Sequence, residues 1–205
     1  FYGKSSIILE DYDTFGGIFM SRTSMDMTRG SLKKQILFFS IPLMLSNLLQ
    51  VLFNMSDIAV IGQFAGAMSL GAVGSTTTLI SMYTGFLIGL SGGINVLTAL
   101  YIGARNRKSV SETVHSAFLV SLAVGLILLI LGVSTSRGVL VLLNTKEELI
   151  DKAAQYIRIY FLGIPALALY NFGNAVFSAA GDTGRPLRYL FLSGIVNVIL
   201  NLIFV

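Results

Sequence analysis

The sequence has 205 residues, of which 54% are hydrophobic and 12% charged, whereas a soluble globular chain carries about 25% charged residues. This composition excludes an ordinary soluble domain and indicates a membrane protein. The chain has no Cys and one His, which excludes disulfides, a thiol nucleophile and a His-based metal cluster, and its net charge of +4 is scattered at the ends of apolar runs rather than gathered into a nucleic-acid patch.

The first residues show no helical or strand periodicity, and the chain opens with Phe1 rather than Met. They lack the basic region, compact apolar core and small-residue cleavage site of a secretory signal. We interpret 1–27 as a disordered or artefactual extension, with Met25 or Met27 as an alternative start.

The remainder, 28–205, predicts an all-α polytopic bundle of about five transmembrane helices, because roughly 20 apolar residues cross a hydrocarbon core of about 30 Å. Pro42 should bend the first span, and the fourth span contains Pro165. A short break is expected at Gln63–Ser69, and the glycines and proline of Gly181–Pro186 predict a turn. The spans run over Ile36–Gly62, Leu70–Gly103, Val110–Ser134, Ile150–Ala180 and from Leu187 to the end.

Lys and Arg residues predict the orientation of these spans. Placing the N-terminus in the cytoplasm puts three basic clusters inside, while the first outer loop has no charge and the second mixes both signs. The cytoplasmic clusters would be Arg29, Lys33, Lys34; Arg105, Arg107, Lys108; and Arg185, Arg188.

A polar stripe marks the first span and ends in its only acidic residue, Asp57. Asn47, Gln50, Asn54 and Asp57 are spaced 3, 4 and 3 residues apart, so they share one helix face. A carboxylate within a span costs about 2.5–3.5 kcal/mol, so it indicates function. Amides alone are also explained by hydrogen bonds between helices, and Asp57 by hydration near the far interface.

Two further amide pairs lie in later spans. Asn171 and Asn174 in the fourth span either line a cavity or hydrogen-bond within the bundle. Asn197 and Asn201 in the fifth span are spaced i, i+4 and so share a face. Hydrogen bonding between helices accounts for the second pair about as well as a functional role does.

Several stretches resemble, in order and spacing, the MATE (multidrug and toxic compound extrusion) family. The resemblance covers about Met25–Val205. The stretches are Met27–Ser31, Ile41–Leu43, Asn47–Gln50, Phe53–Asp57, Ile61–Gly62, Leu70–Ser75, Gly89–Gly93, Tyr101–Ala104, Tyr156–Pro165, Gly181–Pro186 and Asn197–Asn201.

The resemblance implies two lobes of six helices that export organic, often cationic, compounds in exchange for Na⁺ or H⁺. This chain would be the N-terminal lobe, cut in its fifth helix, without the sixth helix and the C-terminal lobe. Asp57 matches the family's cation-coupling acid on the first helix. Asn197 and Asn201 match the two polar positions that share its site; some members carry Asp at the second, so the coupling ion is left open.

The residue chemistry suits either ion. Na⁺ prefers oxygen ligands, which Asp57, Asn197 and Asn201 supply as carboxylate and amide oxygens, and this is the only metal expected. The amides can instead donate hydrogen bonds to the carboxylate. Asn47, Gln50, Asn54, Asn171 and Asn174 are the candidate cavity-lining residues.

The resulting hypothesis is a multidrug antiporter of a bacterial-type plasma membrane. It would need no cofactor besides its coupling ion; its partners would be the bilayer and small organic substrates rather than nucleic acid. The alternatives are a lipid-linked saccharide flippase of the same superfamily, which should carry Arg or Lys in mid-membrane, and a membrane-embedded enzyme. The sole His and absent Cys leave little for catalysis.

Overall fold

The computed structural model describes residues 32–204, so the expectation for 1–27 lies outside the described residues. Every element in this part of the chain is helical. The elements are α2 (Leu32–Val60), the π-helical turn η2 (Ile61–Ala65), α3 (Gly66–Gly103), α4 (Arg107–Leu142), α5 (Glu147–Leu162), α6 (Ile164–Ala179) and α7 (Gly184–Phe204).

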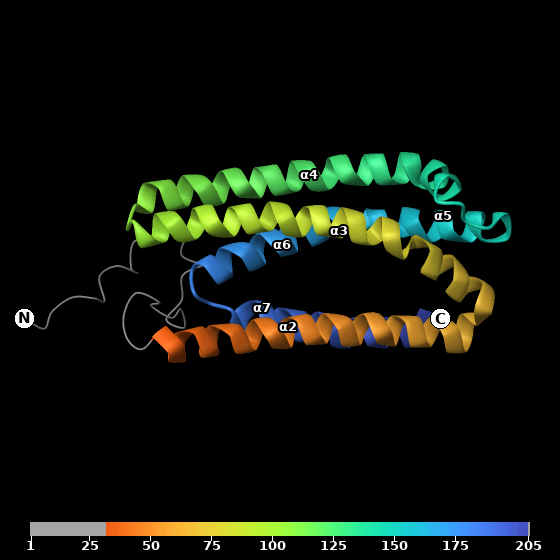
Figure 1. The fold of residues 1–205 in the computed structure, drawn as a ribbon, viewed down its shortest axis with the longest axis horizontal. Helices are drawn as coiled ribbons and strands as arrows, with labels where there is room; N and C mark the ends of the chain where they lie inside the picture. The colour runs from red at the N-terminus through yellow and green to blue at the C-terminus, as the bar shows by residue number, and fades with distance from the viewer. Residues whose placement is uncertain (1–31, 205) are drawn as a thin grey trace, which may run out of the picture.

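Five membrane crossings follow from these helices. The apolar segments of sufficient length are 33–103, 107–142 and 184–203, and α5 and α6 form a fourth that is bent by 47°. The chain reverses direction at η2 (Figure 1), so the first segment contains two antiparallel crossings. The all-α bundle and its approximate helix number are confirmed.

The hydrophobic core lies among α3, α4, α5 and α6. Neither of the two buried core clusters of the described residues includes a side chain from α2 or α7. One cluster surrounds Phe161, whose ring meets the edge of Tyr83 with centroids 4.7 Å apart. A second cluster surrounds Phe172 and lies nearer the C-terminal end of α6 than the first cluster does. The four helices therefore form one packed unit.

Small residues on α4 allow this close packing. Its buried positions recur every three or four residues and include Ser121, Gly125 and Gly132. A Cβ at Gly125 would lie 2.8 Å from the Pro165 Cα, and one at Gly132 would overlap the Phe161 ring. Small residues at such spacing let helix backbones approach each other in a membrane.

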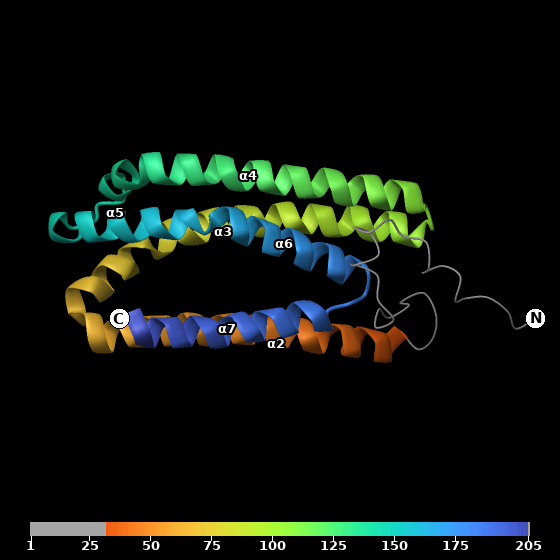
Figure 2. The same ribbon diagram turned by 180° about the vertical axis from the view of Figure 1, so that it is seen from behind.

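Helices α2 and α7 form a separate pair. They lie side by side in both views and stand apart from the α3–α6 unit over much of their length (Figures 1 and 2). The pair is close because Phe53 of α2 packs where a Cβ on Gly194 of α7 would sit. The chain connects the pair to the α3–α6 unit through η2 at one end and through residues 180–183 at the other.

The connections between helices are short. Arg105, Asn144 and Gly181 each adopt a positive φ just after a helix. In all three, the next residue's N–H bonds back to a carbonyl five residues earlier, as in a Schellman motif. The predicted break at Gln63–Ser69 is not a loop in the structure. Helical turns continue through η2, and the chain changes direction at Gly66, whose φ is +81°.

Candidate cation and substrate site

The polar stripe of α2 lies on one helix, as its spacing predicts. The helix continues through Pro42 to Val60, so Asn47, Gln50 and Asn54 extend from successive turns. All three side chains are exposed within the described chain, whereas Asp57 is half-buried. The stripe thus begins in an open region and ends in a contact with another helix.

That contact joins Asp57 to α7. The Nδ2 of Asn201 donates a hydrogen bond to Asp57 Oδ1 and a longer one, 3.4 Å, to Asn197 Oδ1. The structure thus brings together the three side chains that the sequence analysis grouped. Asp57 Oδ1 is the acceptor in this contact, a role that a carboxyl oxygen can fill.

Tyr156 of α5 is a residue that the sequence analysis named only as the start of a family-like stretch. Its phenol lies within the electrostatic influence of the Asp57 carboxylate, and its ring is 6.4 Å from that of Tyr160. The direct contact that joins Asp57 to another helix is its hydrogen bond with Asn201 of α7.

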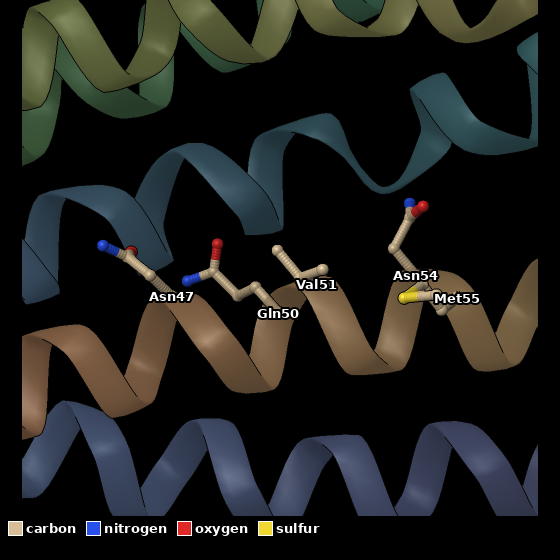
Figure 3. Close-up of a pocket in the computed structure, with 5 residues that line it drawn as sticks. All are labelled: Asn47, Gln50, Val51, Asn54 and Met55. Carbon is tan, nitrogen blue, oxygen red and sulfur yellow. The ribbon is translucent and has the colours of Figure 1, made fainter.

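An open groove of about 420 Å³ runs along α2. Figure 3 shows the amides of Asn47, Gln50 and Asn54 directed to the same side of the helix. Val51 and Met55 complete the lining, so no charged side chain lines it. The groove can offer hydrogen-bond donors, acceptors and a polarisable thioether to a bound molecule.

The two asparagines of α6 do not line this groove. Asn171 donates its side-chain hydrogen bond to Leu167 of its own helix, at 3.0 Å, and Asn174 is half-buried. The amide that joins helices nearby is instead Asn95, which donates from α3 to the Ala175 carbonyl at 2.9 Å. Its isolated position within the second span gave no periodic signal.

The arrangement around Asp57 can hold a small cation. The Asn201 amide nitrogen lies between Asp57 Oδ1 and Asn197 Oδ1, which are the kinds of oxygen that hard cations select. Rotation of that amide would add its own oxygen to the pair. No group of three His, Cys, Asp or Glu side chains placed to hold a metal ion occurs in residues 32–204, so the oxygens gathered here come from one carboxylate and two amides.

The sequence matches the MatE family over residues 42–203. The chain belongs to the MatE family. The matched region includes Asp57, Asn197 and Asn201 and all five crossings apart from the first turns of α2. The chain is thus part of an integral membrane transporter family, and the expected membership is confirmed.

Named relatives agree with this membership. The Bacillus subtilis "Probable multidrug resistance protein YpnP" is 32% identical over 180 residues, which cover 88% of this chain and 40% of that protein. The Thermotoga maritima "Probable multidrug resistance protein NorM" is 26% identical over 83% of this chain and 36% of its own length.

The fold is also that of solved MatE proteins. An outward-facing multidrug resistance MATE transporter superposes with a TM-score of 0.80 at 25% identity, over 89% of this chain and 41% of the other. The chain therefore spans about two fifths of the length of the relatives that it matches. Its five crossings correspond to one part of such a transporter.

Proposed function

We propose that the chain forms the first lobe of a secondary antiporter that exports small organic compounds in exchange for Na⁺ or H⁺. The observation that supports this most is the hydrogen bond between Asp57 of α2 and Asn201 of α7. It places an ionisable group on the helix that also carries the groove. A cation bound there can alter the packing of the two helices that border the substrate space.

The same oxygens suit either coupling ion. With Na⁺, Asp57 and the oxygens of Asn197 and Asn201 would act as ligands. With H⁺, a neutral Asp57 could donate a hydrogen bond to the amide oxygen of Asn201 after that amide rotates. In both cases the occupied site loses the present hydrogen bond from Asn201 to a carboxylate. Coupling would act through this exchange of partners.

The groove favours export of organic molecules over transfer of a lipid-linked pyrophosphate. Its lining consists of three amides, a valine and a methionine, and pyrophosphate recognition calls for Arg or Lys. Asn47, Gln50 and Asn54 would orient a substrate while Met55 adapts to its shape. We propose Asn171 and Asn174 only as members of the wider cavity wall.

We place the protein in a bacterial-type plasma membrane with its N-terminus in the cytoplasm. The start of α2 and the α3–α4 and α6–α7 connections lie at the same end of the bundle (Figure 1). These are the segments that carry Lys33, Lys34, Arg105, Arg107, Lys108, Arg185 and Arg188. A common end rich in Lys and Arg fits the positive-inside rule.

The decisive experiment is Asp57→Asn in the full-length protein, reconstituted in vesicles with Na⁺ or pH gradients. We expect gradient-driven efflux of an organic dye to be lost while membrane insertion is retained, because the neutral amide can neither release a proton nor supply a charged ligand. Glu148→Gln is the matched control, since Glu148 is an exposed carboxylate in the first turn of α5. Normal efflux by Asp57→Asn would refute the proposal.

A further inference from the structure

One ionisable side chain is buried in the described chain, and it lies outside the Asp57 site. Asp182, in the connection between α6 and α7, is 3% exposed. Its Oδ2 receives no hydrogen bond from the described residues but lies 3.1 Å from Arg185 Nε. Since a buried carboxylate is unfavourable without a partner, the guanidinium of Arg185, which also lies over the Phe177 ring, is what compensates it.

The backbone around this ion pair leaves little freedom between the two helices. At the end of α6, Gly181 N–H bonds to the Ser178 carbonyl and Asp182 N–H to the Phe177 carbonyl, with Gly181 at φ +79°. This is a complete Schellman motif. Asp182 Oδ1 then accepts the Arg185 N–H at 3.2 Å, which caps α7. One residue therefore ends the first helix and begins the next.

Capping alone does not explain the carboxylate. The α3–α4 connection has the same backbone pattern, and there Asn106 caps α4 by accepting the Ser109 N–H at 3.1 Å. Asn106 is exposed, and an uncharged amide is sufficient. Asp182 differs in being buried and ion-paired, so its charge serves an interaction that a simple cap does not need.

The α6–α7 connection is also attached to α2. Thr183, which is 5% exposed, donates its hydroxyl to the Phe39 carbonyl at 3.3 Å. Phe39 lies in the turn of α2 that precedes Pro42, where the proline removes a backbone donor from the helix. Pro42 lacks the N–H that would bond the Phe38 carbonyl, so the Thr183 hydroxyl attaches the start of α7 to α2 one residue beyond that gap.

We infer that Asp182, Thr183 and Arg185 form a clasp that positions α7 against α2, and thereby positions Asn197 and Asn201 opposite Asp57. The inference rests on the proposed antiport function. Helix α7 packs along α2 and meets the α3–α6 unit mainly at the end of α6. Three contacts at successive positions along α7 align it with α2. They are the clasp, the packing of Phe53 against Gly194, and the hydrogen bond of Asn201 with Asp57.

The clasp acts at a distance from the cation site. Asn197 follows Arg185 by twelve residues, about 18 Å along a helix. A small change in the direction of α7 at the clasp is magnified at Asn197 and Asn201. Loss of the clasp should therefore weaken cation binding without removing any ligand, as loss of supporting contacts around metal sites does.

The test uses Thr183→Val in the full-length protein, with dye efflux measured against Na⁺ concentration and, separately, against pH. Valine keeps the shape and removes only the donor to Phe39. We expect the half-saturating cation concentration to rise about tenfold while the maximal rate changes by less than about twofold. Thr183→Ser keeps the hydroxyl and should retain the parent cation dependence.

Two further variants distinguish loss of the Asp182–Arg185 ion pair from loss of an exposed charge elsewhere on α7. Asp182→Asn keeps the helix cap but removes the charge, so it should shift cation dependence in the same direction as Thr183→Val. Arg188→Gln removes an exposed positive charge one turn further along α7 and should behave as the parent. Parent-like cation dependence in both Thr183→Val and Asp182→Asn would overturn the inference.

A distance measurement tests the clasp without transport. This chain has no Cys, so within it spin labels attach only at the introduced Leu52→Cys and Val196→Cys, both exposed positions on α2 and α7, and any Cys in the rest of the full-length protein is replaced beforehand. The distance distribution should broaden in Thr183→Val, and an unchanged distribution would also refute the clasp. Dye efflux by Asp57→Asn, measured in parallel, tests the antiport proposal separately. If Asp57→Asn transports normally, the antiport proposal fails, but the distance measurement still tests the clasp.

Discussion

Asn201 is the central residue of the candidate cation site. Its single amide donates to the Asp57 carboxylate and to the Asn197 carbonyl oxygen, so it connects two helices and two potential ligands. Within the described site, the Asn197 side chain joins this network through its hydrogen bond with Asn201. That bond is the longer of the two, at 3.4 Å. The two asparagines, equivalent in the sequence pattern, therefore have unequal roles.

We expect Asn201→Leu to impair cation-dependent efflux more than Asn197→Leu. A hydrogen bond to a charged group contributes about 1.5–3 kcal/mol, against roughly 0.5–1.5 kcal/mol between neutral groups. The first substitution removes the bond to Asp57, and the second removes only the long neutral one. The measurement is the half-saturating cation concentration of each variant in vesicles. A larger shift for Asn197→Leu would contradict the proposed arrangement.

The sequence could indicate Asp57, because a lone carboxylate in an apolar span is energetically exceptional. It could also pair Asn197 with Asn201 by helical spacing. Tyr156 could not be assigned in the same way, since tyrosines occur at both interfaces and in cores. Its position near Asp57 depends on how α5 packs, which a single sequence does not encode in a local pattern.

At the scale of elements, α4 shows how small residues determine packing. Gly132 and Gly138 lie six residues apart on this helix, and the sequence alone does not tell which of them is packed. Gly132 is buried against the ring of Phe161, whereas Gly138 is exposed and a Cβ there would meet nothing within 4 Å. The buried ring cannot move aside, because Phe161 is itself fully enclosed and contacts Tyr83.

Alanine substitutions at these two glycines should therefore have opposite effects. Gly132→Ala should destabilise the fold by about 1–3 kcal/mol through overpacking. Gly138→Ala should be neutral or stabilise it by up to about 1 kcal/mol, because alanine favours the helix. Thermal unfolding of the purified protein in detergent compares the two directly. Equal stability of both variants would mean that Phe161 does not pack on Gly132.

The helices were predictable to within a few residues where apolar length dominates. The bend between α5 and α6 was not predicted, although Pro165 had been noted within the fourth span; the structure places that proline against Gly125. The C-terminal end of α4 was also not predicted. The helix extends to Leu142, past the predicted end of the third span at Ser134. Polar Ser134, Thr135 and Arg137 suggested a boundary, but Thr135 bonds to its own helix and Arg137 pairs with Asp151.

At the scale of the whole molecule, the chain consists of a four-helix unit and a two-helix pair joined at opposite ends (Figures 1 and 2). The candidate cation site lies within the pair, since Asp57 belongs to α2 and Asn201 to α7, and Asp57 is half-buried in the described structure. Movement of the pair relative to the unit would therefore change the surroundings of Asp57. Alternating access in transporters commonly proceeds by such displacement of helices around a fixed site.

The two ends of the bundle differ in charge, and this predicts which end faces the cytoplasm. One end carries the α3–α4 connection with Arg105, Arg107 and Lys108. The opposite end carries the α4–α5 connection, where Lys146 is accompanied by Glu147 and Glu148. Because Lys and Arg in short loops are retained inside while acidic residues contribute little, the first connection should be cytoplasmic.

Cysteine labelling can test this orientation, since the chain supplies no native thiol. Arg105 and Thr145 lie in the connections at opposite ends of α4. In intact cells, a membrane-impermeant maleimide should label Thr145→Cys and leave Arg105→Cys unmodified. Both should react after the cells are permeabilised, which controls for burial of the thiol. Labelling of Arg105→Cys alone in intact cells would reverse the orientation and would move the clasp at Asp182 to the outer face.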